Sequence, residues 1–296
     1  MGQNVLDPVL LEVYSGAIAP PLKRDVLHQW PGRFGLALWA LEDGWAFTTN
    51  SGAAFHVGSD GRSVVCHSGD QGWSGVAAEA FVRRVLPRVV QLHGRLVLHA
   101  AALHTPAGVI LLCGQSRAGK STLAASLSRQ LGWSIMSDDM AAIMDVAGAH
   151  SVLSTSRSVS LWADSEAALA DAFERSERIG VYGTKYRCEP LPAVEHLHGP
   201  LRAICYLAQP VVDTDEGISV SEVEPAGRVA LLAAQVIDFN PADRRNRVQR
   251  FAKLARLAKS VPVVTLHYPR RFATLPKVAE CLSAWVGTGT ACSLSQ

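Results

Sequence analysis

One short stretch of the chain carries the residue types that phosphate chemistry requires. The segment from Gly114 to Ser121, GQSRAGKS, matches the pattern G-x-x-x-x-G-K-[ST]. In this pattern the glycines let backbone N–H groups surround a phosphate at the start of a helix, the lysine reaches the β- and γ-phosphates, and the final hydroxyl binds Mg²⁺. We therefore predict that the chain binds ATP through nine consecutive residues, which are Gly114, Gln115, Ser116, Arg117, Ala118, Gly119, Lys120, Ser121 and Thr122.

Three residues of this loop have individual roles. Lys120 is expected to act in catalysis, because its charge would offset the negative charge that develops as a phosphoryl group is transferred. Thr122 is expected to cap the turn in which it lies. Arg117 is unusual inside such a loop, and the sequence leaves open whether its side chain touches a phosphate or points to solvent.

Two adjacent carboxylates follow the loop. Asp138 and Asp139 end the segment WSIMSDD, where a phosphate-loop enzyme places the carboxylate that binds Mg²⁺ through water. One carboxylate suffices for the metal, so the second could accept the proton of an attacking hydroxyl, as a kinase requires. This assigns Ser121 and Asp138 to Mg²⁺ and Asp139 to general-base catalysis. The alternative is that the pair only forms a turn or caps a helix.

The histidines are less specific on their own. His99 lies in the apolar segment before the loop, and a single histidine in a strand is more often structural than catalytic. His196 and His198 could form a metal pair on one strand face, but no cysteine or carboxylate at ligand spacing accompanies them. We predict a loop there.

The apolar pattern predicts the elements that position these residues. Two strands over 96–103 and 108–114 precede the phosphate loop, a helix over 121–131 follows it and ends at Gly132, and a buried strand then leads to the two aspartates. The order strand, loop, helix, strand is the one that phosphate binding needs. Further strands are predicted over 201–207 and 261–266, and further helices over 165–175, 225–236 and 244–259.

The first third of the chain has a different pattern. Turn signals EDG, NSG and SDG separate short apolar runs between residues 33 and 67, which predicts small antiparallel strands. Residues 75–94 have helical spacing with a kink or break at Pro87. We therefore predict two domains. A small α+β domain over residues 1–90 is a candidate for substrate or partner recognition, and residues 91–296 form the catalytic domain.

Composition restricts the class of protein. With 48% hydrophobic and 18% charged residues the chain is globular, and its net charge of +2 does not favour nucleic acid or a membrane surface as a partner. The six cysteines lie far apart and read as reduced thiols, and no apolar run is long enough for a membrane span, so we expect a cytoplasmic protein. The basic helix over 244–259 should bury its apolar stripe and expose its cations, and that basic face could dock an acidic peptide or a neighbouring subunit.

The histidine, the loop and the aspartate pair together resemble the catalytic domain of bacterial HPr kinase/phosphorylase, a P-loop kinase fold related to phosphoenolpyruvate carboxykinase. In that family a histidine stands fifteen residues before the first glycine, as His99 stands before Gly114, and a strand after the helix ends in Asp-Asp. The similarity covers about residues 95–145. It implies an α/β fold, Asp139 as the general base, His99 as its supporting histidine and Ser121 as a Mg²⁺ ligand.

The rest of the chain departs from the bacterial regulator. Its Glu-x-Arg-Gly signature is absent, and the corresponding region reads STSRSVSLW around Arg157. The layout is similar instead to HPr kinase-like enzymes that phosphorylate a serine of ribosomal peptide precursors such as lasso peptides, in which a pair like Lys185-Tyr186 follows the core. This resemblance suggests Arg157 as a substrate-binding residue, Lys185 as a residue that meets phosphate or substrate, and a homo-oligomer. A solvated loop lysine is the alternative for Lys185.

The sequence thus predicts a phosphotransferase that uses ATP and Mg²⁺ to phosphorylate a serine hydroxyl of a peptide or small protein, with a lasso-type precursor as one candidate. Two other functions stay open. One is a kinase that acts on a small molecule, since the related fold also handles carboxylic metabolites. The other is a nucleotide-responsive regulatory binding module with little catalysis.

Overall fold

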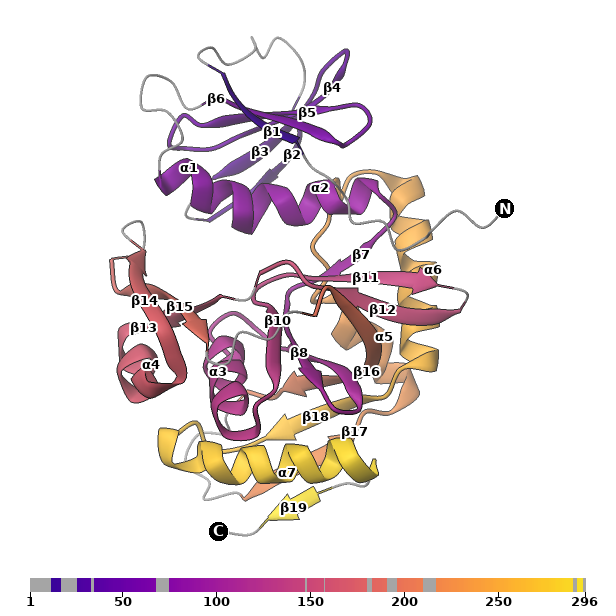
Figure 1. The fold of residues 1–296 in the computed structure, drawn as a ribbon. Helices are drawn as coiled ribbons and strands as arrows, with labels where there is room; N and C mark the ends of the chain where they lie inside the picture. The colour runs from indigo at the N-terminus through magenta and orange to yellow at the C-terminus, as the bar shows by residue number, and fades with distance from the viewer. Residues whose placement is uncertain are drawn as a thin grey trace. The chain divides into compact units, whose positions relative to one another are not determined.

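The computed structural model describes residues 12–16, 26–32, 35–67, 75–146, 148–156, 158–179, 183–190, 196–209, 217–289 and 292–294 (Figure 1). Its contacts divide the chain into two compact units. Unit 1 comprises residues 1–97 and 237–250, and unit 2 comprises residues 98–236 and 251–296. This division differs from the boundary at residue 90 that we predicted, because a segment from the C-terminal half returns to unit 1.

The returning segment is held in unit 1 by aromatic packing. The ring of Phe239 meets those of Trp45 and Phe47 edge-on, at centroid distances of 5.1 and 5.6 Å. The backbone N–H of Phe239 also donates to the Gln91 side-chain carbonyl at 2.8 Å. These contacts join residues 148 or more positions apart in the sequence, so no local pattern could indicate them.

Unit 1 is built on a six-stranded sheet with the order β1-β6-β5-β4-β3-β2. Its strands are β1 (Glu12–Gly16), β2 (Val26–Trp30), β3 (Leu36–Ala40), β4 (Gly44–Thr48), β5 (Ala54–Gly58) and β6 (Ser63–His67). Strands β2 to β6 form an antiparallel meander, and β1 runs parallel to β6. The three turn signals separate β3, β4, β5 and β6 as predicted, with the turn glycines Gly44, Gly52 and Gly61 at positive φ.

One helical segment packs on this sheet. It consists of α1 (Gly75–Ala80), a π-helical turn (Phe81–Val85) and α2 (Leu86–Leu92). The π-helical turn interrupts the α-helix two residues before Pro87, which lies in the first turn of α2 where its missing N–H is tolerated. Phe55 of β5 stacks on Phe81 with ring centroids 5.8 Å apart, so the helical segment covers the sheet face to which Phe55 belongs.

Unit 2 contains a large mixed sheet. Its strands are β8 (Ala100–Thr105), β9 (Gly108–Cys113), β10 (Ser134–Ser137), β11 (Ala141–Val146), β12 (Ala149–Leu153), β16 (His198–Leu207), β17 (Ile218–Glu222), β18 (Val263–His267) and β19 (Cys292–Leu294), while β7 (Leu96–Leu98) spans the boundary between the units. At its centre β9, β16 and β18 run parallel, so their C-terminal ends lie at one edge of the sheet. Every described residue of β9 is buried, as in strands covered on both faces.

Four longer helices belong to this half of the chain: α3 (Lys120–Leu131), α5 (Pro225–Ala233), α6 (Arg244–Ser260) and α7 (Leu275–Thr288), with a 3₁₀ turn at Phe272–Thr274 before α7. Leu123 and Leu127 of α3 share one core cluster with Leu282 and Trp285 of α7 and with β9. This packing fixes the start of α3 at the end of β9. Within the described residues, no helix has the length and apolar character needed to cross a membrane.

A small second sheet lies beside α3 in Figure 1, with the order β13-β15-β14. It is formed by β13 (Val159–Trp162), β14 (Phe173–Ile179) and β15 (Lys185–Pro190), with α4 (Ala163–Ala168) and a 3₁₀ turn (Ala170–Ala172) after β13. The helix predicted over 165–175 is therefore wrong in its second half. The sequence from Phe173 alternates charges along a strand, and Glu177 pairs across from Arg187 of β15, which favours the sheet.

The basic helix α6 also differs from expectation. Val248 and Phe251 are 65% and 60% exposed, whereas Leu254 and Leu257 are buried. The predicted continuous buried stripe is therefore wrong for the first half of α6 and correct for the second. α6 passes from unit 1 to unit 2 between residues 250 and 251, and its buried leucines belong to unit 2.

Candidate phosphate-binding site

The loop between β9 and α3 has the backbone that the sequence pattern predicts. Gly114 and Gly119 have φ angles of 150° and 85°, which residues other than glycine rarely adopt. A Cβ added at Gly114 would lie 3.1 Å from the Cβ of Ala118 and 3.2 Å from the carbonyl oxygen of Leu207. The loop is thus pressed against the end of β16, and only glycine fits at its first position. Gln115, Ser116 and Arg117 are exposed, and Ala118 is buried.

Arg117 has an unusual backbone for its residue type. Its φ of 65° is in the left-handed region, and among the non-glycine residues that the structure describes only Asp139 shares this feature. The Arg117 carbonyl accepts a hydrogen bond from Arg270 Nη1 at 3.3 Å, and Arg270 Nη2 donates to the carbonyl of Ala208 at 2.6 Å. Arg270 therefore ties the exposed tip of the loop to the end of β16.

Sequence reasoning missed Arg270. It follows the end of β18 by three residues, and the parallel strands β9, β16 and β18 end at the same edge of the sheet. A cation placed just after a buried strand is the signal that could have found it. A second link at this edge joins Gln209 Nε2 to Gln115 Oε1 at 2.7 Å.

Lys120 is 5% exposed and folds back on its own loop. Its ammonium group donates to the carbonyls of Gly114 at 3.0 Å and Gln115 at 3.1 Å. Burial lowers the pKa of Lys120 below its ordinary value of 10.5; Cys113 and Asp138 oppose this effect in part, and the nearby cations Lys185 and Arg270 add smaller lowering effects. An anion such as a phosphate would stabilise the charge of Lys120 at this place.

The predicted Mg²⁺ residues lie in contact. Ser121 Oγ donates to Asp138 Oδ1 at 2.7 Å, and Asp138 Oδ2 accepts the backbone N–H of Ser160 at 2.9 Å. A hydroxyl beside a carboxylate is the set of hard oxygen donors that Mg²⁺ uses, with phosphate oxygens and water completing its coordination. In the described part of the chain, no three histidine, cysteine, aspartate or glutamate side chains gather as a metal-binding group. A site completed by a nucleotide does not require one.

The prediction for Thr122 is wrong. The helix α3 has Gly119 at its N-cap and no side-chain capping bond. Thr122 Oγ1 instead donates to Ser165 Oγ of α4 at 3.1 Å. Thr122 lies in the first turn of α3, but its hydroxyl is directed to the neighbouring element and not to the free N–H groups of the helix start.

Asp139 and His99 are linked through the backbone. His99 Nδ1 lies 3.0 Å from the carbonyl oxygen of Asp139, and since a carbonyl only accepts, Nδ1 carries the proton. The backbone N–H of His99 donates to the Gln235 carbonyl at 2.7 Å. His99 falls between β7 and β8 rather than within a strand, and it holds the turn whose left-handed residue is Asp139, with φ of 67°.

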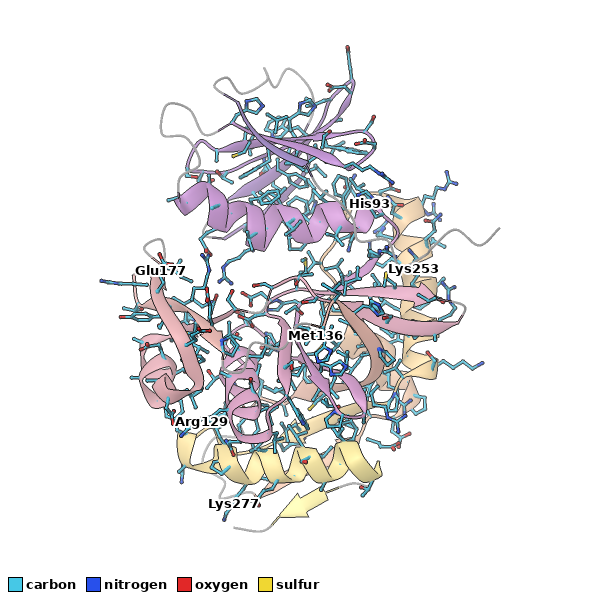
Figure 2. All side chains as sticks on the ribbon, viewed as in Figure 1. His93, Arg129, Met136, Glu177, Lys253 and Lys277 are labelled. Carbon is cyan, nitrogen blue, oxygen red and sulfur yellow. The ribbon has the colours of Figure 1, made fainter. Side chains whose placement is uncertain are left out.

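A polar segment that sequence reasoning did not assign supports the same turn. The carbonyl of Met136, a residue of β10 that is labelled in Figure 2, accepts the Ser154 hydroxyl at 2.9 Å and the Thr155 N–H at 3.0 Å. Thr155 Oγ1 also donates to the carbonyl of Met140 at 3.3 Å. These bonds bracket the two aspartates from both sides, so their turn has a fixed shape. Arg157, the predicted substrate residue in this segment, lies outside the described residues.

Lys185 lies at the first position of β15, directly across from Trp162 of β13. Its Nζ is 5.7 Å from the centroid of the Trp162 ring, and the guanidinium carbon of Arg117 is 5.9 Å from the same ring. Sequence reasoning missed Trp162, which no motif singles out. Trp162 is 38% exposed, so solvent can reach this residue.

The two remaining histidines stand apart from this site. His198 begins β16 and so is not in the predicted loop, whereas His196 is outside any strand. The ring of His196 stacks on His104 of β8 at a centroid distance of 3.7 Å. Stacked imidazoles present their faces to each other and not their nitrogens, so this arrangement does not support the metal pair considered above.

Comparisons with known proteins give little further information. No family model matches the chain, and no curated protein matches it. Among solved structures, the HPr(Ser) kinase/phosphatase from Coxiella burnetii is similar over 64% of this chain and 93% of its own, with 14% sequence identity and a TM-score of 0.31. A likeness at this level establishes no function, so the chemistry has to be inferred from the residues of the site.

Proposed function

We propose that this protein is a kinase that uses ATP and Mg²⁺ to phosphorylate a serine hydroxyl of a peptide or small protein. The observation that carries the proposal is the bond from Ser121 Oγ to Asp138 Oδ1 at 2.7 Å. It joins the start of the phosphate-binding helix to the turn that holds the second carboxylate. The residues proposed to bind the phosphates and the metal therefore belong to the same site as the proposed base.

The loop supplies binding and charge. The glycines allow backbone N–H groups to surround the phosphates, and Lys120 exchanges the carbonyls of Gly114 and Gln115 for β- and γ-phosphate oxygens. Mg²⁺ bound by Ser121 and Asp138 would shield the triphosphate oxygens and orient them for in-line attack. Burial lowers the pKa of Lys120, so a bound phosphate would stabilise its charged form.

Asp139 takes the proton of the acceptor. As the serine oxygen forms its bond to the γ-phosphorus, the bond from that phosphorus to the β-bridging oxygen breaks, the hydroxyl proton passes to the Asp139 carboxylate and ADP leaves. His99 does not enter this step directly. Its bond to the Asp139 carbonyl orients the turn from which the carboxylate extends.

The presence of both carboxylates favours catalysis over a regulatory module that only binds nucleotide, since binding alone needs one. The acceptor class is tested by incubating the full chain with ATP, Mg²⁺ and serine-containing peptides, and by reading phosphate addition with mass spectrometry. We expect phosphoserine with the natural chain and a loss of about 10²- to 10⁴-fold with Asp139→Asn.

Asp145→Asn is the matched control, because Asp145 is an exposed aspartate of β11 outside the site. Its variant should retain the natural rate. Normal transfer by Asp139→Asn would overturn the general-base assignment. If ATP binds but no serine peptide is phosphorylated, a small-molecule acceptor or a nucleotide-responsive module replaces the peptide kinase.

A further inference from the structure

Three side chains from separate segments meet beside the phosphate loop. Arg117 belongs to the loop, Trp162 ends β13 and Lys185 begins β15, and the two cations lie 5.9 and 5.7 Å from the centroid of the same indole ring. Both distances are within the range of attraction between a cation and an aromatic face. We call these three residues the indole cluster.

Each member of the indole cluster has its place set by the backbone. Trp162 and Lys185 are paired directly across β13 and β15, so the register of the small sheet brings them together. The N–H of Ala163, the next residue, donates to the carbonyl of Thr184 at 3.0 Å and extends this pairing. Arg117 has a left-handed backbone, and its carbonyl is held by Arg270.

The strand that carries Trp162 also contacts the predicted Mg²⁺ carboxylate. Ser160 of β13 donates its N–H to the Mg²⁺ carboxylate Asp138, and Trp162 is two residues further along the same strand, on the same face. Lys185 is also close enough to Lys120 to lower its pKa. Since the lysine of this loop pattern reaches the β- and γ-phosphates, Lys185 lies within electrostatic range of the place where those phosphates would bind, and Arg117 belongs to the loop itself.

The cations are held by an interaction that an anion can replace. Trp162 is partly exposed and Arg117 is exposed, so both remain within reach of solvent and of a ligand. Attraction to an exposed aromatic face is weak compared with a charge-assisted hydrogen bond to a phosphate oxygen. The indole therefore keeps two flexible side chains close to the phosphate position without neutralising them.

We propose that Trp162 is a positioning residue that holds Arg117 and Lys185 as a paired cationic subsite for the terminal phosphate of a nucleoside triphosphate. The subsite makes the protein bind a triphosphate in preference to a diphosphate. This inference rests on the nucleotide-binding part of the proposed function and needs no acceptor.

The test measures equilibrium binding of a non-hydrolysable ATP analogue and of ADP, each with Mg²⁺, to the full chain by calorimetry. Trp162→Ala should weaken binding of the analogue by about 10-fold or more and that of ADP by less than about 2-fold. Trp162→Phe keeps an aromatic face and should restore most of the lost affinity. The double variant Arg117→Gln/Lys185→Gln should lose the same discrimination, and adding Trp162→Ala to it should have little further effect, because the three residues act as one unit.

Lys277→Gln is the charge control, since Lys277 is an exposed cation of α7 and is labelled in Figure 2. It should leave both affinities unchanged. Equal weakening of the analogue and of ADP by Trp162→Ala would assign the indole a purely structural role and overturn the inference, as would unchanged binding. If the natural chain binds neither nucleotide, the proposed function fails as well. If it binds both without dependence on Trp162, only this inference fails.

Discussion

His99 donates its Nδ1–H to the backbone carbonyl of Asp139 at 3.0 Å and so holds a residue forty positions away in a left-handed turn. This contact is made with the backbone of Asp139. Through this bond His99 orients the turn from which the Asp139 side chain extends.

The first prediction follows from this contact. His99→Ala removes the donor, so the turn loosens and the Asp139 carboxylate is no longer held in line with the acceptor hydroxyl. We expect kcat for phosphoryl transfer to fall by about 10- to 100-fold, because small displacements of a reacting group have effects of that size. The affinity for Mg·ATP, measured by calorimetry, should change by less than about 3-fold. A loss of nucleotide affinity equal to the loss of kcat would contradict a role confined to Asp139.

The second prediction concerns the first glycine of the loop. Gly114→Ala introduces a Cβ at 3.1 Å from Ala118 Cβ in a backbone with φ of 150°, so the loop must shift. We expect a loss of about 1–3 kcal/mol in the free energy of unfolding, measured with denaturant, and loss of nucleotide binding.

Gly287→Ala provides the control for this substitution. Gly287 lies inside α7, has no atom within 4 Å of an added Cβ and lacks a positive φ. Alanine should leave stability unchanged or raise it by up to about 1 kcal/mol. Comparable destabilisation by both substitutions would show that the loop geometry is not the cause.

The third prediction concerns Arg270. Its guanidinium bonds the carbonyls of Arg117 and Ala208 at the same time, which a shorter or uncharged side chain cannot reproduce. Arg270→Gln should free the tip of the phosphate loop and weaken Mg·ATP binding by about 5- to 50-fold, a size typical of charge-assisted hydrogen bonds. Arg271→Gln removes a charge from the exposed neighbouring residue and should have little effect in the same binding assay. Equal effects of the two variants would indicate general electrostatic attraction instead.

The fourth prediction uses the lowered pKa of Lys120. Burial penalises its charged form in the folded state, and the cations Lys185 and Arg270 add to the penalty. Below the lowered pKa this group therefore destabilises the fold, and the penalty is relieved as pH rises through that pKa towards the ordinary value of 10.5. Lys120→Met removes the titrating amine, and with it the contribution of Lys120 to the pH dependence of stability. Relative to Lys120→Met, the natural chain should gain stability as pH is raised from 8 towards 10.5.

The measurement is the free energy of unfolding of both proteins across that pH range, without nucleotide. Lys120→Met should at the same time lose Mg·ATP binding at neutral pH, because the ammonium group is needed for the phosphates. A stability difference that does not change with pH would show that the pKa of Lys120 is not lowered by folding.

The site residues that sequence reasoning found belong to segments whose function depends on local backbone. The glycines of the loop, Lys120 and Ser121 are fixed by the need for a tight turn between a buried strand and a helix, and their spacing is therefore visible in the chain. The aspartate pair was visible for the same reason, since it ends the next buried strand. The contact of Ser121 with Asp138 follows from the strand, loop, helix, strand order.

The tertiary structure decided the contacts that surround this core. Arg270, Trp162 and Lys185 come from three distant segments, and they meet the loop only because parallel strands end at one edge and because β13 pairs with β15 in one register. The same limit applies to Phe173, which joins a strand where helical spacing was predicted, and to Phe239, which returns to unit 1. A local sequence pattern indicates which backbone conformation a segment prefers, whereas strand pairing depends on residues far along the chain. Sequence therefore determined the phosphate loop and its carboxylates, and only the fold determined which cations face them.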